Sequence, residues 1–161
     1  DVKVILAGGS AGSGTSDLTE TIKITNTSGA PLDFHFFQYA NLHLGGQTVN
    51  DSVEIRGGNT AVQTCGSTIV SETADVPTPS RYEAGLAFNT LNSLTDGSPT
   101  SLSNQAGPTG PGDLTWAFQW DKTIAAGGSL LISKDMHVVP EPATLGLLVL
   151  GGLTVIARRR R

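Results

Sequence analysis

The chain has 161 residues, a formal net charge of −4 and a single cysteine. One cysteine excludes an intrachain disulfide, a thiolate zinc cluster and a CxxC redox motif. Without the four C-terminal arginines, six Lys and Arg stand against fourteen Asp and Glu, so residues 1–157 carry a charge of −8. Because nucleic-acid binding needs a basic face, we predict no nucleic-acid partner; an acidic domain attracts divalent cations or basic matrix components instead.

The first part of the chain is typical of short β-strands joined by turns. Residues 2–7 are apolar and β-branched, and residues 18–25 alternate between apolar and polar side chains. Residues 8–16 are rich in Gly, Ser and Ala, which predicts a hairpin loop between these two strands. Residues 26–31 predict a turn, and residues 32–39 carry aromatic side chains on both faces, which we interpret as a central strand.

The rest of the domain continues in the same style. Residues 88–94 predict one short helical turn with Leu91 and Leu94 packed against the domain, and residues 95–112 predict a long surface loop because they hold three prolines among Gly, Ser and Asn. The remaining β candidates, separated by Gly, Asn, Pro and Ser clusters, are 49–55, 61–65, 68–73, 81–88, 114–120 and 129–133. This spacing predicts an all-β fold, an antiparallel β-sandwich that is Ig-like or jelly-roll-like.

Three aromatic side chains mark the strand at 114–120. Trp116, Phe118 and Trp120 recur at every second residue, so they share one face. We interpret this face as core. The alternative is an exposed aromatic face, on which Trp116 and Trp120 would stack against sugars.

Candidate metal ligands are few. His35 shares a predicted strand face with Asp33, and a strand pair could bring His43 near them, but a metal site needs three or four converging ligands and His137 lies far along the chain. We therefore predict no metal site and no cofactor, and interpret these residues as solvated or hydrogen-bonded.

Other polar motifs have simpler interpretations. Asp51 and Glu54 could hold calcium weakly, but their spacing is not that of an EF-hand, and we favour a polar surface turn. Cys65 is expected to be a small buried strand residue rather than a reactive thiol. The tripeptides 26–28 and 50–52 fit the glycan acceptor pattern. No nucleophile elbow is present, and we predict that the chain is not an enzyme.

The C-terminal segment is built differently from the domain. An uncharged apolar run extends over residues 143–157, and as a helix it would be about 22 Å long, shorter than the roughly 30 Å hydrocarbon layer of a bilayer. It therefore predicts a single short transmembrane helix that anchors weakly, with a permanent anchor as the alternative. The membrane-facing residues are Ala143, Leu145, Leu147, Leu148, Val149, Leu150, Leu153, Val155 and Ile156.

The flanks of this run set its orientation. The terminal cluster Arg158, Arg159, Arg160 and Arg161 belongs on the cytoplasmic side by the positive-inside bias, so the domain is exported. On the other flank, prolines restrict the backbone, and the segment Val139, Pro140, Glu141 and Pro142 is expected to be extended. Since export requires a leader, we expect that Asp1 follows a removed leader or that the chain is a fragment.

Pro-Glu-Pro, a short apolar span and terminal arginines, in this order, resemble the PEP-CTERM sorting signal of exported bacterial proteins. The resemblance implies that residues 1–137 are an exported domain and residues 138–161 a sorting tail. It also implies an exosortase as the partner that recognises Val139, Pro140, Glu141 and Pro142 and removes the tail. The inner membrane would hold the helix transiently, before the protein reaches the envelope or extracellular matrix of a Gram-negative bacterium.

The domain resembles other PEP-CTERM ectodomains more loosely. Residues 18–46 share a strand, an Asn-Thr-Ser turn and a Leu-Gly-Gly exit with them, and residues 118–134 resemble their closing hairpin, turned by Gly127 and Gly128. Two function classes stay open. We favour a structural protein of the cell surface or of an exopolysaccharide matrix; the alternative is an exported domain that binds or processes carbohydrate.

Overall fold

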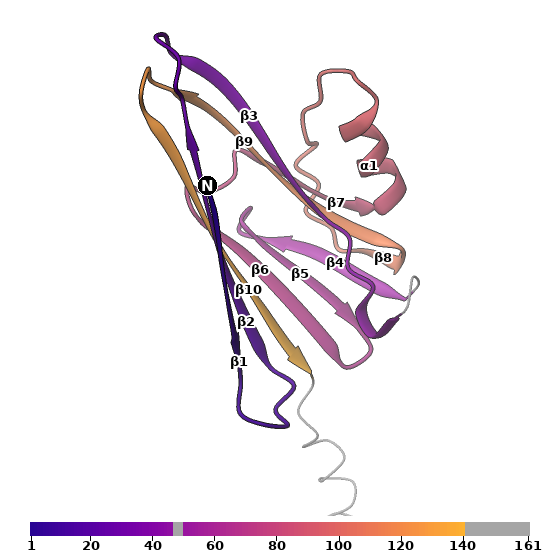
Figure 1. Ribbon diagram of the computed structural model, residues 1–161. Helices are drawn as coiled ribbons and strands as arrows, with labels where there is room; N and C mark the ends of the chain where they lie inside the picture. The colour runs from indigo at the N-terminus through magenta and orange to yellow at the C-terminus, as the bar shows by residue number, and fades with distance from the viewer. Residues whose placement is uncertain (47–49, 141–161) are drawn as a thin grey trace, which may run out of the picture.

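The computed structural model describes residues 1–46 and 50–140. In this part of the chain, ten strands form two antiparallel sheets that pack face to face, with one helix beside them (Figure 1). The seven-stranded sheet has the order β1-β2-β10-β6-β5-β4-β8, and the three-stranded sheet has the order β3-β9-β7. The predicted antiparallel β-sandwich is confirmed, although seven and three strands differ from the four and three of an Ig constant domain.

The bounds of the elements follow the alternation of the sequence. The large sheet holds β1 (Val2–Gly8), β2 (Ser16–Thr25), β4 (Asp51–Arg56), β5 (Thr60–Cys65), β6 (Thr68–Val76), β8 (Thr109–Gly112) and β10 (Ser129–Pro140). The small sheet holds β3 (Leu32–Ala40), β7 (Arg81–Leu86) and β9 (Leu114–Ile124). A 3-10 turn, η1 (Leu44–Gly46), follows β3, and helix α1 (Ala87–Thr95) follows β7.

The core lies between the two sheets, and β9 supplies its largest side chains. Trp116, Phe118 and Trp120 are completely buried, and the ring of Trp120 packs 5.7 Å from that of Phe36, between centroids. From the large sheet they meet Ile22 and Ile132, among other residues. A buried aromatic side chain contributes several kcal/mol to folding, about 3–5 by truncation to alanine, so this strand is the main source of hydrophobic stabilisation.

Two connections cross between the sheets where the sequence suggested simple turns. The segment after β2 leads to β3 in the other sheet, and Gly127 and Gly128 lead from β9 to β10 in the other sheet. Gly127 has a φ of 68°, which favours glycine, and the amide of Gly128 donates to Ala125 O. The expected closing hairpin is therefore wrong: β9 and β10 are joined by an arch, and they do not pair.

Three further expectations need correction. β3 is an edge strand, and on its outer face Tyr39 Oη donates to Ala87 O of α1 at 3.1 Å. Helix α1 is present, but Leu91 is 44% exposed, and the buried residues of the helix are Ala87 and Thr90. The predicted loop at 95–112 contains β8, which pairs with β4.

Candidate functional site

The predicted aromatic sugar platform is not available in the folded domain. Trp116 and Trp120 are both 0% exposed, and Trp120 Nε1 donates to the carbonyl oxygen of Pro77 at 2.7 Å. The two side chains share a face, as expected, but that face is the interior of the sandwich. The hypothesis that this pair stacks on sugars is therefore wrong, and its core interpretation holds.

The predicted metal candidates have separate partners. Asp33 accepts from Thr123 Oγ1 at 2.7 Å, His35 Nδ1 lies 2.7 Å from Asp121 Oδ1, and His43 Nε2 lies 3.7 Å from Asp113 Oδ1. Each histidine thus has a different carboxylate partner. Among residues 1–46 and 50–140, no group of three or more metal-ligating side chains converges.

Asp51 and Glu54 lie on opposite faces of β4. Asp51 is 1% exposed and accepts a hydrogen bond from Gln63, whereas Glu54 points outward and pairs with Arg56. The calcium hypothesis and the polar-turn interpretation are both wrong for Asp51, because its side chain lies inside the domain. Asp51 adjoins the half-buried Cys65. The hydrogen bond with Asp51 is the largest cause that raises the pKa of the Cys65 thiol, and burial of the thiol and the negative charge of Asp51 raise it further.

One predicted glycan acceptor, Asn26, is engaged in hydrogen bonds within the domain. Asn26 is 2% exposed, and its Nδ2 donates to the carbonyl oxygens of Ala30, Ile124 and Ala125 at 2.8, 2.9 and 3.1 Å. The side chain ties the crossing after β2 to the arch after β9. Asn26 therefore has a structural role, and its amide nitrogen is not free for modification.

A polar pocket opens between the sheets, and sequence reasoning missed it. It has a volume of about 550 Å³ and lies between β2, β10 and β6 of the large sheet and the edge strand β3. Its walls include Leu18, Phe36, Leu42 and Met136. Its floor is a cluster of ionisable side chains on the inner face of the large sheet.

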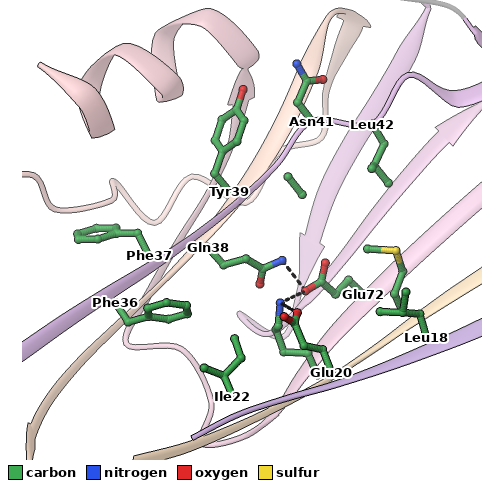
Figure 2. Close-up of a pocket in the computed structure, with 13 residues that line it drawn as sticks. Leu18, Glu20, Ile22, Phe36, Phe37, Gln38, Tyr39, Asn41, Leu42 and Glu72 are labelled. Carbon is green, nitrogen blue, oxygen red and sulfur yellow. Dashed lines mark hydrogen bonds and ion pairs between the residues drawn. The ribbon is translucent and has the colours of Figure 1, made fainter. Parts of the chain in front are cut away.

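Lys134 is the centre of this cluster and is only 5% exposed. Its Nζ lies 2.7 Å from Glu20 Oε2 and 3.2 Å from Glu72 Oε1, and Gln38 Nε2 donates to the same Glu72 oxygen at 2.6 Å. In Figure 2 the side chain of Gln38 reaches toward the carboxylate of Glu72, and Glu20 lies just below it. Burying a charge is costly unless it is paired, so the three side chains depend on one another.

The sequence contains a pattern that indicates this cluster: on three strands, a charged residue stands at a position where the alternation calls for an apolar one. Glu20 lies in phase with Leu18 and Ile22, and Lys134 lies in phase with Ile132 and Met136. Glu72 likewise falls between the buried Val70 and Ala74. A charged residue in the apolar phase of a strand indicates either a buried ion pair or a site. The strand predicted at 129–133 stops short of Lys134, so the sequence alone does not show that Glu20 and Lys134 lie on neighbouring strands.

A second groove lies on the outer face of the small sheet. It has a volume of about 490 Å³ and is lined by His35, Arg81 and Asp121 together with the segment after α1. Burial opposes ionisation of Asp121, but hydrogen bonds from Gln119 and His35 and the charges of His35 and Arg81 hold its pKa below the usual value. The arrangement keeps Asp121 an anion and orients the imidazole of His35.

The C-terminal end of β10 connects the domain to the predicted tail. β10 is an interior strand, and Val138, Val139 and Pro140 pair with Val70, Ile69 and Thr68 of β6. Val139 and Pro140 are extended, as predicted. Glu141, Pro142, the apolar run and the arginine cluster lie outside the described residues. No helix in the part of the chain that the structure describes is both long and apolar enough to cross a membrane.

Comparison with protein families gives one match. The model of the PEP-CTERM protein-sorting motif matches residues 138–161. The chain carries a PEP-CTERM sorting motif. The comparison with curated proteins found no match.

The matched motif begins inside the sheet. Its first three residues, Val138 to Pro140, are the last residues of β10. The predicted boundary at residue 137 therefore falls within a strand, because β10 runs on to Pro140. The motif implies that an exosortase processes the chain, that the domain is exported and that the C-terminus anchors it transiently.

Proposed function

We propose that the chain is a non-enzymatic structural protein of the bacterial cell surface or extracellular matrix. In this account an exosortase recognises Val139 to Pro142, removes the apolar tail and releases the β-sandwich to its destination. The observation that carries the proposal is the sorting motif at residues 138–161. A tail used only for sorting leaves the domain itself as the working part of the mature protein.

The construction of the domain supports a structural role. Both tryptophans and Phe118 are buried in the core, and residues 1–157 carry a net charge of −8. A net charge of this size keeps a secreted domain soluble and attracts cationic components of a matrix. The interior position of β10 in the large sheet also means that the tail is attached to a strand held on both sides.

Cell fractionation tests this proposal. The protein is followed by immunoblot in the native host and in the same host without its exosortase. We expect the domain in the envelope or matrix fraction of the first and in the membrane fraction of the second. A structural component acts in proportion to its amount, so graded depletion should weaken the matrix progressively. Retention in the membrane fraction of both hosts would refute the proposal.

Trp116 and Trp120 are buried and cannot support the carbohydrate-binding alternative, but the domain has another surface that could bind a small ligand. The pocket between the sheets is large enough for a small ligand and combines apolar walls with a polar floor. The chemistry of that floor narrows the kind of ligand that it would hold.

A further inference from the structure

Two polar atoms of the pocket between the sheets have no hydrogen-bond partner among residues 1–46 and 50–140. Oε2 of Glu72 and Oε1 of Gln38 are both buried, and both are acceptors. Glu72 itself is 1% exposed, and its other oxygen already serves Lys134 and Gln38. A buried carboxylate oxygen without a donor is costly, so the site is complementary to a molecule that donates hydrogen bonds.

The charge of the cluster favours a cation as that donor. Two carboxylates, Glu20 and Glu72, face one ammonium, Lys134, which leaves one uncompensated negative charge. A neutral donor would satisfy the free oxygens but leave this charge, whereas an ammonium group would do both. A divalent metal fits poorly, because Lys134 occupies the space between the two carboxylates.

The pocket is accessible along the uncovered part of the large sheet. In the register of β1 and β2, Val4 lies opposite Glu20 and Leu6 opposite Leu18, so both share the inner face with the pocket. They are 54% and 70% exposed, because the small sheet does not reach over β1. A ligand can therefore enter from this side with its charged group first and rest its body on the apolar strip.

We propose that this pocket binds a small molecule with a primary ammonium group on a hydroxylated or partly apolar body. The ammonium group donates to Glu72 Oε2 and neutralises the cluster, and a further donor of the ligand meets Gln38 Oε1. Phe36, Leu18 and Met136 hold the body. The binding site is independent of the sorting tail, so it stands whether or not the tail is removed.

Titration calorimetry on the full chain in mild detergent tests the proposal with two probes. Glucosamine carries an ammonium group where glucose carries a hydroxyl group, and the rest of the ring is the same. We expect saturable binding of glucosamine and at least about tenfold weaker binding of glucose, as a charge-assisted hydrogen bond implies. Equal affinities, or no saturable binding of glucosamine even at millimolar concentration, would overturn the proposal.

Variants identify the site. Glu72→Gln removes the buried negative charge but could unfold the domain, since Lys134 would lose a charged partner. Glu20→Gln is therefore the main variant: Glu20 is 25% exposed, and its change cancels the net charge while Lys134 keeps Glu72. It should weaken glucosamine binding about tenfold and leave glucose unchanged. Glu54→Gln, on the outer face of β4, should change neither; if Glu20→Gln binds glucosamine as the unmodified chain does, the assignment fails.

Discussion

Single side chains decide several features of this domain, and Asp51 is the clearest case. Sequence alone placed it on a polar surface turn, because an Asn-Asp-Ser tripeptide is typical of turns. The structure places it inside the domain beside Cys65 and Gln63. Its negative charge and hydrogen bond keep the thiol protonated, so a cysteine that is only half-buried should still react slowly.

Asp51→Asn should lower the pKa of Cys65, because it replaces the carboxylate that raises it with a neutral amide. The thiolate fraction at pH 8 then increases, and alkylation by iodoacetamide should become several-fold faster. The pH at which the rate reaches half its maximum should fall as well. Asp17→Asn, at an exposed position, serves as the control; identical pH profiles for Asp51→Asn and the unmodified chain would contradict this account.

Asn26 should be among the most sensitive polar residues. Asn26→Ala leaves the carbonyl oxygens of Ala30, Ile124 and Ala125 without their side-chain donor, which costs about 1–3 kcal/mol of unfolding free energy. Urea denaturation followed by tryptophan fluorescence measures the loss. Asn92→Ala, on the exposed face of α1, should change stability by less than about 0.5 kcal/mol. Equal effects of the two substitutions would show that Asn26 does not tie the crossings together.

At the scale of elements, the sequence predicted the strands better than their partners. Alternation located β2, because a half-buried strand shows its two faces in the sequence. β3, β5 and β9 were expected from β-forming side chains between clusters of turn residues. The sheet assignment could not be read in this way. A two-faced aromatic pattern predicted that β3 is central, yet β3 is an edge strand, and on its outer face Tyr39 contacts α1.

β10 illustrates the limit most directly. The strand predicted at residues 129–133 ends just before the charged residues Lys134 and Asp135. In the structure Lys134 is neutralised by partners on β2 and β6, so the strand continues for seven more residues to Pro140. The candidate pocket was missed for the same reason, because it depends on contacts between strands far apart in the sequence.

Val138→Pro should strongly destabilise the large sheet. Val138 lies between Ser16 of β2 and Val70 of β6, and proline removes a ladder hydrogen bond from this interior strand. We expect a loss of about 3 kcal/mol or more. Val138→Ala, which keeps the amide, should cost clearly less, and thermal unfolding compares the two. If both variants melted together, the end of β10 would not be held within the sheet.

The molecule as a whole combines an acidic β-sandwich with a C-terminal sorting motif, and the two meet without a separate linker. The core of the sandwich is built on the side chains of β9. β10 is an interior strand of the large sheet, and its last three residues are the first three of the motif (Figure 1). The sorting motif at residues 138–161 could be predicted from the sequence, because its signals are contiguous there. The site between the sheets could not be predicted from the sequence, because its residues come together only in the folded domain.

The most direct test of sorting is the mass of the mature protein. The protein is recovered from its native host, and its intact mass and C-terminal peptide are measured for the unmodified chain, for Glu141→Ala and for Glu54→Ala as a control. The account predicts that the unmodified chain and the control end near the Pro-Glu-Pro segment, whereas Glu141→Ala retains the tail. A mature unmodified protein that still ends at Arg161 would contradict sorting by cleavage and make the chain a resident membrane protein.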